Sequence, residues 1–176
     1  MEYFNLDNLV IRQECEADYS EIRNLVETAF LSAQHSDGDE QDLVERIRNT
    51  KEYLPSLTFV AVYDGRLVGH LMMSKIYIDG NEAVAIAPLS VLPDFQKKGV
   101  GSALIERAHS EAEKHGYNCS VVLGSPDYYS KFGYREASVY GIYPPFDVPL
   151  HYYMVYPFKA SAVPNGMVHY SNAFGI

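Results

Sequence analysis

The sequence predicts a single domain of the mixed α/β class. Three observations support this prediction: apolar residues at helical spacing near the N-terminus, strand-like runs joined by Asp-Gly turns after them, and a glycine-rich segment that opens a further helix. The 176 residues, 47% of them hydrophobic, are enough to bury one substantial core. We expect the domain to span residues 1–160 and a polar, aperiodic tail to follow at 161–176.

The N-terminal part predicts one strand and two helices. Residues 9–12 are strand-like. Asp18 and Glu21 have a capping-box-like spacing and precede an apolar face at positions 22, 25, 26 and 29, which predicts the first helix. The second helix is expected from about Glu40, after a polar loop at 34–39.

The middle part predicts an antiparallel meander followed by a crossover helix. Its strand-like runs are 57–63, 67–78 and 82–92. The dipeptides Asp64-Gly65 and Asp79-Gly80 separate these runs, and Asp-Gly is a strong hairpin signal. A helix over 99–115 follows. The apolar run 120–123 after it should then pair in parallel with the last strand of the meander.

The C-terminal part predicts a short helix over 125–133 and two further strands, at 134–139 and 151–156. Prolines place an irregular loop between these strands. The aromatic residues of this part fit two interpretations. They form a hydrophobic β-rich face, or the loop from Tyr143 to His151 lines a pocket for a second substrate.

The segment 89–104 predicts an anion-binding site. An apolar strand ends at a proline, and two glycines then open the helix. The first turn of a helix has backbone N–H groups without intrahelical partners at the positive end of its dipole. Gly99 and Gly101 lack the Cβ atoms that would keep a phosphate oxygen away, and Lys97 and Lys98 add positive charge.

Two common nucleotide motifs do not fit this segment. A dinucleotide fingerprint needs a third glycine where Leu104 stands, and no P-loop string is present. The string Gln96-x-x-Gly99-x-Gly101 resembles the acyl-CoA pyrophosphate loop of the GCN5-related N-acetyltransferases, the GNAT superfamily. The run 129–134 resembles the Y-x-K-x-G-F segment of that family, with Tyr in place of its final Phe.

The resemblance covers residues 9 to about 158, and the run 123–134 with the Pro-Pro-Phe-Asp-Val-Pro segment after it is similar to the YhbS-like branch. It implies the GNAT fold, acetyl-CoA as cosubstrate, and direct attack of a primary amine on the thioester in a ternary complex. It also implies Tyr129 as the general acid that protonates the CoA thiolate. The cofactor-binding residues that it implies are Leu89, Val91, Gln96, Lys97, Lys98, Gly99, Val100, Gly101 and Ser102.

In this resemblance the backbone of Leu89 and Val91 pairs with pantetheine, while residues 96–102 wrap the pyrophosphate and an N–H near Val91 polarises the thioester. The general base stays unassigned. Residues 84–91 contain no acid, Glu82 lies at the start of that strand, and a strand histidine such as His70 is more often structural. Two alternatives therefore stay open: a non-catalytic acyl-CoA sensor, and transfer of a longer acyl group.

Composition narrows the expected partners. A net charge of −9 argues against nucleic acid, so we expect a small-molecule or peptide amine as acceptor. The apolar stretches are too short to span a membrane and no signal peptide is apparent, which predicts a cytoplasmic protein. We separately expect a monomer or a homodimer. No His/Cys cluster has metal-ligand spacing, so no metal is expected. Cys15 and Cys119 are expected to be two buried free thiols.

Overall fold

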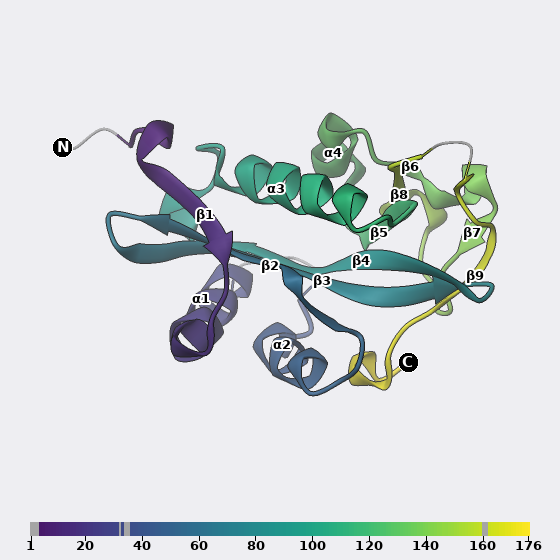
Figure 1. The fold of residues 1–176 in the computed structure, drawn as a ribbon, viewed down its shortest axis with the longest axis horizontal. Coiled ribbons are helices and arrows are strands. Elements are labelled where there is room, and N and C mark those ends of the chain that lie inside the picture. Colours follow the sequence, from purple (N-terminus) through teal and green to yellow (C-terminus); the bar gives the residue numbers. More distant parts are fainter. Residues whose placement is uncertain (1–3, 32, 34–35, 160–161) are drawn as a thin grey trace.

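A mixed sheet with helices on both faces organises the chain (Figure 1). The computed structural model describes residues 4–31, 33, 36–159 and 162–176. The helices are α1 (Tyr19–Phe30), α2 (Glu40–Arg48), α3 (Val100–Lys114) and α4 (Pro126–Tyr129). The strands are β1 (Leu9–Gln13), β2 (Tyr53–Tyr63), β3 (Arg66–Ile78), β4 (Asn81–Val91), β5 (Cys119–Leu123), β6 (Arg135–Glu136), β7 (Ile142–Tyr143), β8 (Tyr153–Pro157) and β9 (Gly166–His169). Figure 1 shows α3 and α4 over one face of the sheet and α1 and α2 over the other.

The sheet follows the order β1-β2-β3-β4-β5-β8-β6, with β9 beside the end of β3 and β7 beside β9. In the described part of the chain, only the pairs β4–β5 and β7–β9 are parallel. The structure therefore confirms the predicted mixed α/β class and the parallel crossover that α3 makes between β4 and β5.

Both N-terminal helices form where the sequence predicts them. Each packs an apolar stripe against the sheet. The buried apolar residues of these stripes are Ile22, Leu25, Val26, Val44 and Ile47. Of the polar loop predicted between the helices, residues 34–35 lie outside the described residues.

The two Asp-Gly turns of the meander are also confirmed. Asp64 and Gly65 have φ angles of 50° and 77°, and Asp79 and Gly80 have 46° and 81°. Positive φ at both central residues is the geometry of a type I′ hairpin, whose twist matches that of the flanking strands. These turns join β2 to β3 and β3 to β4 in antiparallel register.

Strand β4 carries a bulge that separates it from β5. Two of its residues, Ala87 and Pro88, lie opposite Met72 alone on β3. A bulge bends its strand and interrupts regular pairing. On the other side, β4 pairs with β5 only at residues 84–85, and the two strands diverge beyond that point. Among the described residues, no strand covers the β5-facing edge of β4 at 89–91.

The strand predicted at 134–139 is wrong beyond its first residues. Only Arg135–Glu136 pair with β8, and Ala137–Tyr140 form a 3-10 turn instead. The Ser138 hydroxyl hydrogen-bonds to the carboxylate of Glu136 at the start of this turn. Such a local side-chain hydrogen bond favours a turn over continued strand pairing.

Much of the segment predicted as a tail, 161–176, packs against the rest of the domain. Gly166–His169 form β9, which pairs with the end of β3. Farther along, the guanidinium of Arg46 on α2 donates to the carbonyl of Ala173 at 2.9 Å, and Ala173 is buried. These elements are three or four residues long, too short to show a period in the sequence.

The prediction of two buried thiols holds for Cys119 and is wrong for Cys15. Both cysteines are free, and Cys15 is exposed because it lies in the connection between β1 and the 3-10 turn at Glu16–Asp18. Burial raises the pKa of the Cys119 thiol to about 12, so this thiol is protonated at neutral pH and chemically unreactive.

Candidate active site

A groove of about 410 Å³ lies where β4 and β5 diverge. It is lined by Leu89, Val91, Gln96, Lys97, Gly101, Ser125, Tyr128 and Tyr129. Six of these eight residues were predicted from the sequence as cofactor-binding or catalytic. The structure adds Ser125 and Tyr128, which precede Tyr129 in the chain. The groove thus joins the free edge of β4, the start of α3 and the helix α4.

The exposed edge of β4 presents backbone groups to this groove. The N–H of Leu92 donates to the carbonyl of Val68 on β3 at 2.9 Å. Because hydrogen-bonding directions alternate along a strand, the backbone groups of Leu89 and Val91 point away from β3, toward the diverging side. The side-chain amide of Gln96 donates to the carbonyl of Val91 at 3.1 Å. This bond anchors the loop to the strand edge.

The loop after β4 reaches α3 through two residues in the left-handed region. Lys97 has a φ of 60°, and Gly99, the N-cap of α3, has a φ of 89°. Lys97 lines the groove. The ammonium of Lys98 instead lies 5.6 Å from the ring of Phe4 and 5.7 Å from that of Phe95, in a cation–π position outside the groove. The two lysines therefore have different surroundings.

Gly101 has a steric role that the sequence does not show. A Cβ built at this position would overlap the hydroxyl of Tyr128, whereas the next nearest atom, Tyr128 Cζ, would be 3.6 Å away. Val100 is buried in the core, and Ser102 is partly buried in the first turn of α3. These two residues can reach a ligand in the groove only through atoms of that first turn.

Tyr129 is held at the end of α4 with its ring against Gly124, where any Cβ would overlap the ring. It is buried, and its hydroxyl has no hydrogen-bond partner among the described residues. Burial raises the pKa of Tyr129 far above its usual value, so the phenol is protonated at neutral pH. The ring of Tyr128 meets it edge-on at 5.0 Å. The structure thus supplies two neutral phenols beside one groove.

A buried polar cluster lies near β4, on the face of the sheet that α1 and α2 cover. Glu14, which follows β1, accepts hydrogen bonds from Arg48 at 2.7 and 2.9 Å and from Tyr53 at 2.7 Å. The Nε2 of His70 lies 3.0 Å from the same carboxylate. Burial acts to raise the pKa of Glu14, but the bonds from Arg48 and His70 outweigh it and lower the pKa to about 2.

This cluster escaped the sequence reasoning because its members come from four separate elements. No local motif or period connects them. The paired positions of β1, β2 and β3 and the packing of α2 bring them together. Glu82, the acid at the start of β4, instead forms an ion pair of 2.9 Å with Lys75. It lies at the far end of β4 from the groove.

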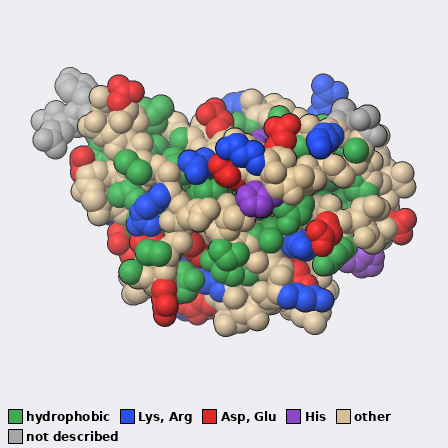
Figure 2. All heavy atoms as spheres, in the orientation of Figure 1, with side chains coloured by type: hydrophobic (Ala, Val, Ile, Leu, Met, Phe, Trp, Pro, Cys, Tyr) green, Lys and Arg blue, Asp and Glu red, His purple; other side chains and the backbone are tan. Residues whose placement is uncertain are grey.

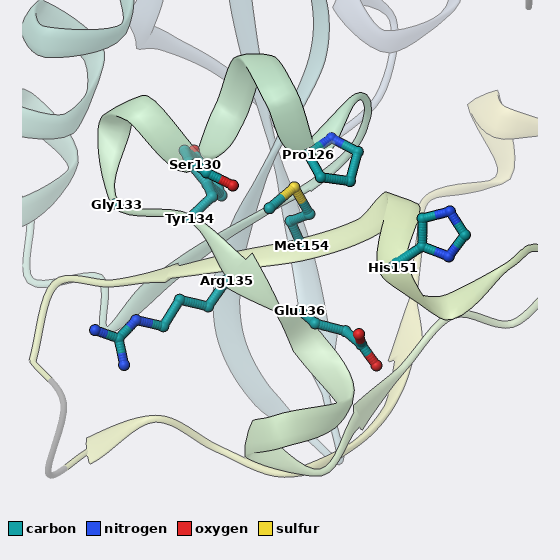
Figure 3. A pocket seen from close by; sticks show the side chains of 8 residues that line it. All are labelled: Pro126, Ser130, Gly133, Tyr134, Arg135, Glu136, His151 and Met154. Atoms are coloured by element: carbon teal, nitrogen blue, oxygen red, sulfur yellow. The ribbon is translucent and has the colours of Figure 1, made fainter.

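A second pocket, of about 460 Å³, lies beside α4 and β6 (Figure 3). The loop from Tyr143 to His151 contributes His151 to its lining. Figure 3 shows the side chains of Arg135 and Glu136 pointing in opposite directions, so they do not converge on a common ligand position. On the face seen in Figure 2, acidic and basic side chains are interspersed.

A parallel strand pair that diverges beside a glycine-opened helix and a buried tyrosine defines the acyltransferase class that the sequence predicts. The sequence model of the acetyltransferase (GNAT) family matches residues 19–134. The chain belongs to this family. Within the described residues, no helix is long and apolar enough to cross a membrane.

Relatives in sequence and structure agree with this assignment. The chain is 30% identical over 139 residues to the uncharacterized N-acetyltransferase YjhQ of Escherichia coli, a match that covers 76% of this chain and 74% of that protein. Its fold matches the crystal structure of E. coli YhbS in complex with CoA, with a TM-score of 0.87, 25% identity and coverage of 96% and 93%. A GNAT acetyltransferase of Brucella melitensis in complex with acetyl-CoA matches with a TM-score of 0.79, 31% identity and coverage of 94% and 97%. The predicted family, its YhbS-like resemblance and the acyltransferase class are confirmed.

Proposed function

We propose that this chain transfers the acetyl group of acetyl-CoA to a primary amine, on a small molecule or a peptide, by direct attack in a ternary complex. The observation that carries the proposal is the groove between β4 and β5. It brings the backbone edge at Leu89 and Val91 together with the buried phenol of Tyr129, whose hydroxyl has no hydrogen-bond partner among the described residues. The related YhbS and Brucella structures, which contain CoA and acetyl-CoA, support the choice of cofactor.

The cofactor would bind along the groove in two parts. Pantetheine carries amides, and these can pair with the β4-edge groups of Leu89 and Val91 as an added strand would. The pyrophosphate fits the N-terminus of α3, where residues 99–102 present backbone N–H groups and Lys97 supplies charge. Lys98, beside Phe4, contributes to the local positive potential from outside the groove.

The chemistry then needs few protein groups. The lone pair of the amine attacks the thioester carbonyl carbon, a C–N bond forms, and the C–S bond breaks with its electron pair left on sulfur. A backbone N–H of the β4 edge near Val91 polarises the carbonyl, and holding both substrates together supplies much of the rate. Tyr129 protonates the departing thiolate, a role for which a phenol kept neutral by burial is suited.

The test is thiol release from acetyl-CoA against a panel of polyamines, amino acids, aminoglycosides and N-terminal peptides. Tyr129→Phe should lower kcat by about 10²-fold with little change in acetyl-CoA affinity, because only the transferable proton is lost. Tyr128→Phe is the matched control and should retain most of the wild-type kcat. Equal losses in the two variants would contradict the role given to Tyr129.

The same panel separates the alternatives. Acetyl-CoA binding without turnover of any amine would favour the sensor, and faster turnover of a longer acyl-CoA would favour the transfer of that group. The cytoplasmic location and the monomeric or homodimeric state stay predictions from the sequence.

A further inference from the structure

Two buried polar side chains, neither with a hydrogen-bond partner for one of its atoms among the described residues, lie side by side in the sheet. His70 on β3 and Ser90 on β4 are directly opposed in register, so their side chains project from the same face. Neither Nδ1 of His70 nor Oγ of Ser90 has a hydrogen-bond partner in the described structure. His70 is 0% exposed and Ser90 is 2% exposed. Buried polar atoms are normally paired, so two neighbouring exceptions indicate a role other than packing.

The hydrogen bond to Glu14 fixes the state of His70. The carboxylate of Glu14 is ionised and only accepts, so Nε2 of His70 carries the proton that lies between them at 3.0 Å. The free Nδ1 is then a lone pair that can accept a proton. Opposite it, the Ser90 hydroxyl can both accept and donate, as a proton-relaying group must.

The position of Ser90 connects this pair to the proposed chemistry. Ser90 lies between Leu89 and Val91, whose backbone faces the groove. Gly101 of α3 and Tyr128 and Tyr129 of α4 line the groove, so a cofactor seated there lies on the side of these helices. The relay requires the amine to approach the thioester from the other side of the β4 edge, the face that carries the side chains of Ser90 and His70.

We infer that Ser90 and His70 take up the proton that the attacking amine loses, with Glu14 stabilising the resulting imidazolium. This inference rests on the proposed acetyl transfer. As the amine nitrogen bonds to the carbonyl carbon, one of its N–H protons passes to Oγ of Ser90, whose own proton moves to Nδ1 of His70, directly or through one bridging water. The thiolate takes its proton from Tyr129, and both groups return to their starting states by exchange with solvent.

The groups around His70 suit a base that is neutral at rest. They are Glu14 after β1, Asp18 in the 3-10 turn before α1, Arg48 on α2 and Tyr53 on β2. Burial lowers the pKa of His70, and Arg48 acts in the same direction, whereas Glu14 and Asp18 oppose them. The net pKa lies below the ordinary value, so the ring is unprotonated at pH 7 and available as a proton acceptor.

The experiment uses three variants of the full chain, assayed with acetyl-CoA and the panel amine that the wild type turns over fastest. Ser90→Ala removes a hydroxyl that has no hydrogen-bond partner in the described part of the chain. His70→Gln keeps an amide N–H for Glu14 but removes the Nδ1 lone pair. Ser74→Ala is the control, because Ser74 is a fully buried serine of β3 that is bonded only to a neighbouring backbone carbonyl.

We expect kcat at pH 7 to fall about 10²-fold in His70→Gln and about tenfold in Ser90→Ala, where water can replace the hydroxyl, and to stay unchanged in Ser74→Ala. In the wild type, kcat should fall on the acid side of the ordinary histidine pKa, as a base with a lowered pKa requires. His70→Gln should lose this limb, whereas a purely structural role for His70 would leave it in place.

A second measurement needs no turnover. Imidazole nitrogen NMR of the protein alone should show His70 neutral at pH 7 with its proton on Nε2, and the Nδ1 signal should shift in Ser90→Ala. A proton on Nδ1, or an active wild type whose kcat and pH profile survive both substitutions, would overturn the relay. A wild type that binds acetyl-CoA but turns over no amine counts against the proposed transfer itself, and the relay fails with it.

Discussion

The contact between Gly101 and Tyr128 allows a test of why this glycine opens α3. In Gly101→Ala the new Cβ overlaps one atom, the Tyr128 hydroxyl, because Cζ of the same ring is already at the ordinary distance of 3.6 Å. Overpacking of this kind costs about 1–3 kcal/mol. Alanine gains up to about 1 kcal/mol over glycine in a helix. The net expectation is a change between about zero and a loss of about 3 kcal/mol.

The same substitution should behave differently once the hydroxyl is absent. In a Tyr128→Phe background the overlap is gone, so Gly101→Ala should be neutral or stabilising by up to about 1 kcal/mol. The coupling between the two positions is therefore about 1–3 kcal/mol. Urea denaturation of the wild type, both single variants and the double variant measures it, with an unchanged m-value as the check on two-state behaviour.

Measuring acetyl-CoA binding separates two explanations for glycine at position 101: the contact with the Tyr128 hydroxyl and the close approach of a phosphate. If phosphate oxygens also approach the first turn of α3, Gly101→Ala weakens acetyl-CoA binding even in the double variant, whose stability is restored. Equal losses of stability with and without the Tyr128 hydroxyl would refute the steric argument. Full recovery of acetyl-CoA affinity in the double variant would instead refute the close approach of phosphate.

Two further predictions concern the ends of the proposed proton path. Gly124→Ala displaces the ring of Tyr129 and should lower kcat about tenfold or more while leaving acetyl-CoA affinity within about twofold, as single-turnover kinetics and calorimetry can check. Glu14→Gln leaves the guanidinium of Arg48 buried without a countercharge and should cost about 3–5 kcal/mol by urea denaturation. Because the pKa of Glu14 is lowered from 4.5 to about 2, its contribution is fully present above pH 4.5 and is lost as the pH falls through 2, so the variant should lack the corresponding part of the acid transition. A variant with an unchanged acid transition would contradict this account of Glu14.

The sequence alone was enough to predict the parts of the fold that depend on residues close together in the chain. The Asp-Gly turns were predictable because both central residues need positive φ, and α3 was predictable from its glycine start and apolar face. The groove followed from the same segment, since Leu89 through Gly101 are close in the chain. Tyr129 could be placed there by its offset from Gly133.

Contacts between distant residues could not be predicted in this way. The short strand β9 has no period of its own and forms because the end of β3 offers free backbone groups. Tyr128 and Gly101 approach each other only after α3 and α4 have packed. Glu14 and His70 are 56 residues apart, and their pairing depends on the joint register of β1, β2 and β3.

Strand β9 also covers a backbone edge of the sheet that another chain could otherwise pair with. β2 accompanies β3 only as far as Ser74, so the backbone of Tyr77 and Ile78 would form an open edge without the C-terminal segment. Open edges are templates on which a second chain can add a strand, the first step of aggregation. Gly166–His169 occupy this position and β7 pairs with their other side, so this C-terminal segment covers the edge at the end of β3. Expression of the domain in a form that stops at residue 160 would therefore expose the β3 edge that β9 covers.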